Sequence, residues 1–311
     1  MIEKGKGRSG MAGSSLAIDC EDGHMLRGHL WEPASSERGA AGAVVVIAGA
    51  TGVKASYYHR YAAFLAENGF TVLTFDYRGI GQSRGSTIKN LAASWYDWGL
   101  KDLDAVLGWV LLHCGEKKLN VVGHSFGGFG VGLAANGRRI NRLLTVGAQH
   151  AYWRDYRPGH RLGLWWRWHA LMPVVAWWYG YFPGKHLGWL EDLPQGVAMD
   201  WARGRKDFTA RRAGPLRQQI QANQASFTAP TLAVAATDDP FATDVAVART
   251  LAYYPKSPAT VVRLKPQDFD RAEIGHFSLF HSSFRHTFWP GTLQWLREGV
   301  NPWPQHQARI D

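Results

Sequence analysis

A serine lies between two glycines in residues 121–128, Val-Val-Gly-His-Ser-Phe-Gly-Gly. The apolar residues 119–122 predict a buried strand, and residues 126–135 predict a helix that starts directly after Ser125. A serine hydroxyl becomes a nucleophile when a sharp turn from strand to helix exposes it beside a base. Free backbone N–H groups at the start of that helix can stabilise an oxyanion. The segment therefore predicts Ser125 as a nucleophile, although the glycines could also form a turn in which Ser125 only caps the helix.

The elements that must position this serine alternate between strands and helices. Apolar runs predict strands at residues 15–19, 25–31, 43–48, 70–75, 119–122, 142–146, 230–236 and 259–264. Helical spacing predicts helices at residues 57–68, 91–112, 244–253 and 290–298. This order predicts an α/β protein with a mostly parallel sheet and helices on both faces. Ligands of such sheets bind beyond the carboxyl ends of the strands, where the glycine-rich and polar loops of this chain fall.

The length of 311 residues fits one large domain, or one domain that carries an insertion. We predict a disordered leader at residues 1–14, a core in two parts at 15–147 and 227–311, and an insertion at 148–226. The first residues lack the apolar run of a secretion signal. The two cysteines, Cys20 and Cys114, provide neither a disulfide framework nor metal-ligand spacing. We therefore expect a cytoplasmic protein.

The chain has a formal net charge of +10. A basic excess is typical of proteins that meet nucleic acid, anionic membranes or acidic substrates. No nucleic-acid motif accompanies the charge, so we favour a membrane surface or plain solubility over nucleic acid.

The loops at the predicted strand ends resemble those of serine hydrolases of the α/β-hydrolase superfamily. The resemblance spans residues 15–297 and rests on residues 49–50, 76–83, 123–128, 238–240 and 275–277. Within the superfamily the chain is most similar to an uncharacterised bacterial group of predicted hydrolases near the serine-aminopeptidase and monoglyceride-lipase-like branch. The resemblance implies an α/β-hydrolase fold in which a helical cap is inserted into the core.

The resemblance also implies a catalytic triad in the order serine, acid, histidine. The acid falls in the loop after the strand at 230–236, where Asp239 directly precedes Pro240 as the family's acid often does. We favour Asp239 over its neighbour Asp238, although both could simply shape the turn. The Gly-His pair at His276 matches the family's base. Neither a metal nor an organic cofactor is implied.

Other histidines are weaker candidates for the base. His281 and His286 fall in an aromatic segment that is more typical of packing. His124 directly precedes Ser125 in the turn from strand to helix, and its side chain must point away from Ser125.

An oxyanion hole needs backbone donors beside the nucleophile. The first is the N–H of Phe126, and the family's His-Gly-x turn assigns the second to Ala50. Ala48 stands where the family has its histidine, which leaves the donor open between Ala50 and Thr51. The turn at 76–83 is predicted to be a scaffold beneath this loop.

The insertion is rich in aromatic and basic residues. Residues 162–182 are apolar enough to suggest a membrane span, but Arg167, His169 and Pro173 argue against it. One interpretation is a helical cap with a small aromatic core. The other is an apolar acyl-binding wall whose arginine-rich outer face makes peripheral contact with anionic lipid or a partner. We predict Trp165, Trp177 and Trp178 as substrate-binding residues; the tryptophans of the insertion are Trp153, Trp165, Trp166, Trp168, Trp177, Trp178, Trp189 and Trp201.

The sequence thus predicts a serine hydrolase that cleaves an ester or thioester with an apolar acyl group through an acyl-enzyme. A small-peptide or amide hydrolase is the alternative, but an aminopeptidase needs acidic groups near its pocket. The insertion has few: Asp155, Glu191, Asp192 and Asp200. A binding protein on the same fold, without catalysis, is the third possibility, because a fold alone implies no activity.

Overall fold

The computed structural model describes residues 13–33 and 42–309. The predicted leader at 1–14 lies outside these residues except for its last two. Strand β1 (Ser14–Asp19) begins at Ser14, one residue earlier than predicted.

Within the described residues the central sheet has nine strands, in the order β1-β2-β4-β3-β5-β6-β9-β10-β11. The six inner strands from β4 to β10 pair in parallel. The edge strands β1, β2 and β11 pair antiparallel. The mostly parallel sheet is therefore confirmed. The remaining strands of this sheet are β2 (Met25–Trp31), β3 (Ala43–Ala48), β4 (Thr71–Phe75), β5 (Lys118–His124), β6 (Arg142–Val146), β9 (Thr231–Ala236), β10 (Ala259–Leu264) and β11 (Gln307–Ala308).

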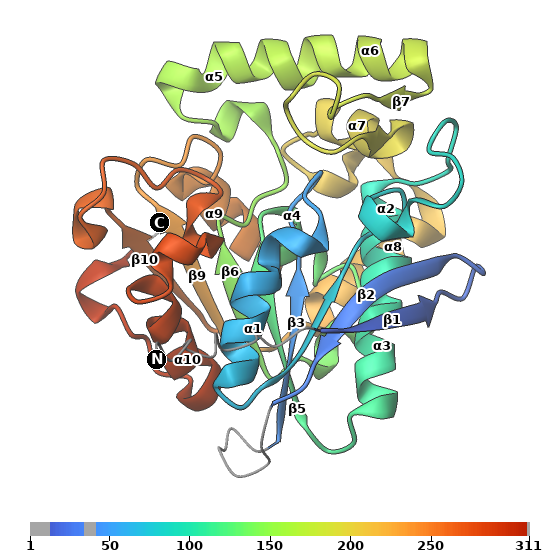
Figure 1. Cartoon of the computed structure of the whole chain (residues 1–311). Helices are drawn as coiled ribbons and strands as arrows, with labels where there is room; N and C mark the ends of the chain where they lie inside the picture. The colour runs from blue at the N-terminus through green and yellow to red at the C-terminus, as the bar shows by residue number, and fades with distance from the viewer. Residues whose placement is uncertain (1–12, 34–41, 310–311) are drawn as a thin grey trace, which may run out of the picture.

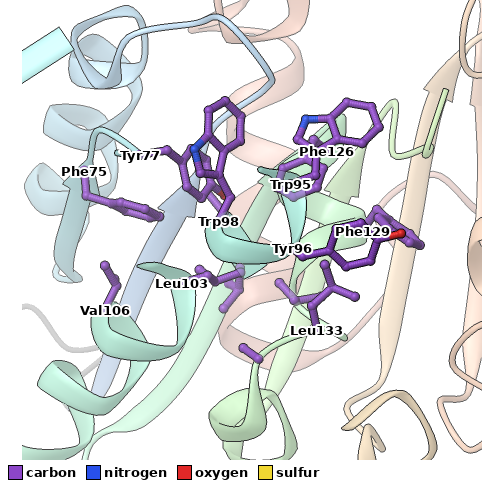
Figure 2. Packing of buried hydrophobic residues seen from close by; sticks show 14 of the residues in the cluster. Phe75, Tyr77, Trp95, Tyr96, Trp98, Leu103, Val106, Phe126, Phe129 and Leu133 are labelled. Atoms are coloured by element: carbon purple, nitrogen blue, oxygen red, sulfur yellow. The ribbon is translucent and has the colours of Figure 1, made fainter. Parts of the chain in front are cut away.

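Helices cover both faces of this sheet (Figure 1). Helices α1 (His59–Glu67) and α10 (Phe288–Glu298) pack on one face, where Leu65 and Trp289 share a buried cluster with strand residue Ile47. Helices α3 (Asp104–His113) and α8 (Gly214–Ser226) lie on the other face. Figure 2 shows the aromatic cluster there, with Trp98 against Tyr77 and Trp95 close to Phe126. Successive strand residues point to opposite faces, so each inner strand feeds both clusters.

Two predicted helices differ from the structure. The predicted helix at 91–112 is a short helix α2 (Trp95–Asp97), a π-helical stretch (Trp98–Leu103) and α3. The predicted helix at 126–135 ends early, as α4 (Phe126–Gly130). Glycine is a poor helix former, and the four glycines between 127 and 132 explain the early end. The remaining predicted helices are α1, α9 (Asp244–Leu251) and α10. These helices and the predicted strands end within two residues of the expected positions.

The segment between β6 and β9 rises above the carboxyl edge of the sheet (Figure 1). Helix α5 (Pro158–Trp165), a π-helical turn (Trp166–Leu171) and α6 (Met172–Tyr179) form a rod across the top. Below it lie α7 (Gln195–Ala202) and the small hairpin of β7 (Tyr181–Phe182) and β8 (Leu193–Pro194). Helix α8, at the end of the predicted insertion, instead packs on the core, where Asn223 Nδ2 donates to the Leu133 carbonyl at 2.6 Å. In the part of the chain described, no helix combines the length and apolar character needed to cross a membrane.

Candidate active site

Ser125 occupies the sharp turn between β5 and α4. Its backbone has φ 52° and ψ −120°, in the positive-φ region that a residue with a side chain rarely adopts. The Ser125 N–H donates to the Val146 carbonyl at 2.9 Å, which ties the turn to β6. A Cβ on Gly127 would lie 2.1 Å from the Ala48 carbonyl oxygen, so only glycine lets α4 approach β3 this closely. The predicted sharp turn from strand to helix is therefore present, with a glycine at the position where α4 approaches β3.

Asp239 and His276 form the hydrogen-bonded pair that the sequence predicts. His276 Nδ1 lies 2.7 Å from Asp239 Oδ2, and Asp239 Oδ1 accepts from the N–H groups of Phe241 and Ala242 at 2.8 and 3.0 Å. Burial by itself raises the pKa of Asp239, but the nearby His276 and the two amide donors outweigh it, so the pKa lies below its usual range. An ionised Asp239 keeps the imidazole proton on Nδ1, which leaves Nε2 free to accept one.

Gly147, at the end of β6, provides the room for this pair. A Cβ there would lie 3.1 Å from both Asp239 Oδ2 and the His276 ring, and its φ of 61° also favours glycine. Three loops that follow β6, β9 and β10 thus meet at one point of the sheet edge.

Asp238 has a different position from its neighbour. Its Oδ2 accepts from the N–H groups of Ile274 and Gly275 at 2.8 and 3.0 Å, so it braces the backbone just before His276. The structure therefore separates the two acids: Asp239 contacts the imidazole and Asp238 contacts the loop. The alternative bases His281 and His286 are exposed and do not line the cavity beside Ser125.

Ser125 and His276 line the same cavity, but over the described residues they share no hydrogen bond. Among the described residues, the side chain that hydrogen-bonds to the serine is Gln149, whose Nε2 donates to Ser125 Oγ at 3.4 Å. Catalytic hydrogen bonds of unliganded enzymes are often long and tighten when substrate binds. Gln149 was missed in the sequence, where its only signal is its place in the loop that follows β6.

A buried chain of hydrogen bonds links the oxyanion loop to the histidine loop. His124 Nε2 lies 2.9 Å from the His276 carbonyl, which can only accept, so Nε2 carries the proton. His124 Nδ1 must then accept from the Tyr58 hydroxyl at 2.8 Å, and that hydroxyl oxygen accepts from the Ala50 N–H at 2.9 Å. Burial lowers the pKa of His124 to about 3, which keeps the ring neutral. As expected, His124 is turned to partners other than Ser125.

These hydrogen bonds bear on the second oxyanion donor, which the sequence left open between Ala50 and Thr51. Ala50 and Thr51 both line the cavity. The Ala50 N–H donates to the Tyr58 hydroxyl, whereas the Thr51 N–H has no acceptor in the described part of the chain. The Phe126 N–H, at the start of α4, is likewise free there. Of the two amides that the sequence left open, only that of Thr51 is therefore free to bind an oxyanion beside the Phe126 N–H.

The turn at 76–83 supports the oxyanion loop through Asp76. Asp76 accepts from the Ala55 N–H at 2.7 Å and from the Gln82 N–H at 2.8 Å, just after the oxyanion loop. Arg78 lies elsewhere, since its guanidinium pairs with Asp102 and Asp22, each at 2.6 Å.

The cavity has a volume of about 370 Å³ and is mainly apolar. Its aromatic wall is built by Trp95, Trp168, Trp189 and Trp201, and Trp168 stacks on Trp201 with centroids 4.7 Å apart.

The prediction of Trp165, Trp177 and Trp178 as substrate-binding residues is not met by the structure. Their side chains are 37%, 68% and 77% exposed, and none of them lines this cavity. They lie on the outer side of the rod formed by α5, the π-helical turn and α6. The inner side of this rod presents Leu164 and Trp168 to the cavity. In the described part of the chain, no three His, Cys, Asp or Glu side chains converge as a metal-binding group.

Comparison with known proteins places this chain in a family. A family model described as the alpha/beta hydrolase fold matches residues 42–268. The chain belongs to this α/β-hydrolase fold family. The predicted superfamily and fold are thereby confirmed, and family membership supports a hydrolase as the class of the protein. No curated protein matches the chain.

Solved structures of other hydrolases share the fold of this α/β-hydrolase. A soluble variant of the monoglyceride lipase of Saccharomyces cerevisiae has a TM-score of 0.66 and 15% identity, over 99% of this chain and 100% of that chain. A monoacylglycerol lipase of Paleococcus ferrophilus has a TM-score of 0.55 and 16% identity, over 88% and 99%. An esterase of Pyrococcus furiosus has a TM-score of 0.54 and 17% identity, over 92% and 90%. At these identities the likeness is one of fold.

Proposed function

We propose that the protein is a serine hydrolase that cleaves an ester or thioester with an apolar acyl group. The observation that carries the proposal is the Asp239–His276 pair, which opens into the same apolar cavity as Ser125 on its strained turn. The lipase and esterase names of the fold neighbours agree with this chemistry.

In the proposed mechanism, His276 Nε2 takes the proton of the Ser125 hydroxyl while Oγ attacks the carbonyl carbon of the ester. The N–H groups of Phe126 and Thr51 stabilise the oxyanion that forms. The intermediate then collapses, the bond to the alcohol or thiol breaks, and the leaving group takes the proton from His276. Water, deprotonated by the same histidine, attacks the acyl-enzyme; the acid leaves and Ser125 regains its proton.

The lining of the cavity favours esters over small peptides. An aminopeptidase must hold a substrate ammonium group, and no Asp or Glu is among the described residues that line the cavity. The acids of the cap region are held by cations elsewhere, in the pairs Asp155–Arg249, Glu191–Lys54, Asp192–Arg84 and Asp200–Arg212. The apolar wall suits an alkyl chain. Cys20 and Cys114 are both free, in keeping with the cytoplasmic location that we also propose.

Labelling with a fluorophosphonate probe tests the serine mechanism against a binding protein without catalysis. We expect the wild type and the control Ser283→Ala, an exposed serine, to label, and Ser125→Ala not to label. Circular dichroism of each variant checks the fold. A folded wild type that fails to label would refute the serine-hydrolase proposal.

A series of para-nitrophenyl esters tests the apolar pocket. We expect kcat/KM to rise from acetate to butyrate and octanoate, because each added methylene buries apolar surface against the tryptophan wall. A preference for acetate would contradict the apolar pocket, and faster cleavage of leucine para-nitroanilide than of any ester would favour the aminopeptidase alternative.

A further inference from the structure

The outer side of the cap helix carries the largest run of exposed apolar side chains in the described chain. Along the rod formed by α5, the π-helical turn and α6, eight large apolar residues are at least 37% exposed. Isolated apolar residues on a surface are ordinary, but a contiguous patch marks a contact site. These residues, here called the outer cap face, are Leu162, Trp165, Trp166, Leu171, Val174, Trp177, Trp178 and Tyr179.

The outer cap face is separate from the cavity. The inner side of the same rod packs against the rest of the protein. Trp168 lines the cavity, and Met172 and Ala176, which follow it at four-residue steps, are buried. On the outer side, Trp166 and Val174 are both 63% exposed. Figure 1 shows the rod at the top of the molecule, with the rest of the protein on one side of it only. Packing of the cap therefore does not account for the outer residues.

The charge around the outer cap face is positive. Residues 156–190 include no Asp or Glu. Exposed Arg154 and Arg157 precede α5, and exposed Lys89 lies beside Gly180 at the far end of α6. The acids that follow the cap helices, Glu191 and Asp192, are paired with cations. A face rich in tryptophan with basic residues at both ends is complementary to an anionic lipid surface.

We propose that the outer cap face docks on an anionic lipid bilayer, with the rod lying in the plane of the lipid headgroups. Tryptophan and tyrosine side chains favour this boundary because one end of each is apolar and the other is polar. Docking places the cavity directly beneath the lipid surface, since Leu164 and Trp168 of the same rod line it. This inference goes beyond the proposed hydrolysis and does not depend on it, because docking is measured without substrate.

Co-sedimentation with vesicles tests the proposal. The cap variant is Trp166→Ser/Val174→Ser/Trp178→Ser, whose three positions are 63%, 63% and 77% exposed and line no part of the cavity. The control triple, Leu112→Ser/Val245→Ser/Val300→Ser, removes apolar side chains that are 78%, 55% and 49% exposed outside the cap.

We expect the wild type and the control to sediment with vesicles of phosphatidylcholine and phosphatidylglycerol. The cap variant should partition about a hundredfold more weakly, because each lost side chain removes buried apolar area. Binding should weaken in high salt. Hydrolysis of a short soluble ester should not change.

Four outcomes would overturn the proposal. The wild type could stay in the supernatant with anionic vesicles, or the cap variant could bind as well as the control. Equal binding to pure phosphatidylcholine would remove the requirement for anionic lipid. Light scattering after gel filtration detects the fourth: a wild-type dimer that the cap variant converts to a monomer, without vesicle binding, would make this face a contact between two copies of the chain.

Discussion

Replacing Asp239 with asparagine tests the proposed role of the hydrogen bond between Asp239 and His276. The carbonyl oxygen of the introduced asparagine can still accept from the N–H groups of Phe241 and Ala242, which now hold Asp239 Oδ1 at 2.8 and 3.0 Å. The new amide NH₂ then faces His276 Nδ1, at the 2.7 Å contact that the carboxylate now makes. Because that NH₂ donates, Nδ1 must accept, and the imidazole proton moves to Nε2. Protonated Nε2 cannot take the proton of Ser125, so kcat should fall on the order of 10⁴-fold, or about 5 kcal/mol of activation free energy.

The adjacent Asp238→Asn is the matched control. Asp238 holds only the N–H groups of Ile274 and Gly275, which an asparagine oxygen can also accept, so we expect less than about a tenfold loss of kcat. The assay is para-nitrophenyl butyrate hydrolysis near neutral pH, with thermal unfolding to show that both variants fold. Equal losses in the two variants, or an Asp239→Asn enzyme that keeps more than about a tenth of the activity, would refute this division of roles.

Three further predictions concern stability. Burial lowers the pKa of His150 to about 4, below the unfolded value of about 6.5, so its stabilising contribution is present above that pH and lost as pH falls. In urea titrations between about pH 6 and 4, the unfolding free energy of the wild type should therefore fall more steeply than that of His150→Gln, by up to about 1.4 kcal/mol per pH unit, and equal slopes would contradict it. Gly127→Ala places a Cβ against the backbone of Ala48 and should lower the free energy of unfolding by roughly 3 kcal/mol or more. The control Gly163→Ala, in helix α5 with open space around it, should raise the melting temperature, and similar melting temperatures of the two variants would refute the close packing beside Ser125. Tyr58→Phe leaves a buried donor and a buried acceptor unpaired and should remove about 2–5 kcal/mol in chemical denaturation, and a change under about 0.5 kcal/mol would show that the buried chain carries no stability.

Short-range patterns in the sequence were sufficient for much of the fold and for the positions of three site residues. Apolar runs and helical spacing depend on neighbours within a few residues, and they located most strands and helices to within two residues. Ser125, Asp239 and His276 each follow a predicted strand, and parallel strands bring their carboxyl ends to one edge of the sheet. The structure accordingly gathers these three residues at one place, while their catalytic roles stay proposals.

Other features depended on contacts between distant residues. Thr51 rather than Ala50 keeps its amide free because Tyr58, itself held by His124, occupies the Ala50 N–H. No local pattern encodes that arrangement. In the sequence, only its place before Pro240 favoured Asp239 over Asp238, and the contacts with the loop that carries His276 separate the two acids.

The cap shows the same division most clearly. Its tryptophans alone indicated an apolar contact surface, but a helix that is apolar on nearly all sides has no periodic signal to distinguish its inner side from its outer side. The sequence by itself therefore determined that a tryptophan-rich segment is inserted between two strands of the sheet. Only the tertiary structure decided that Trp168 faces the cavity while Trp165, Trp177 and Trp178 face outward, because that choice depends on how the whole rod packs on the core.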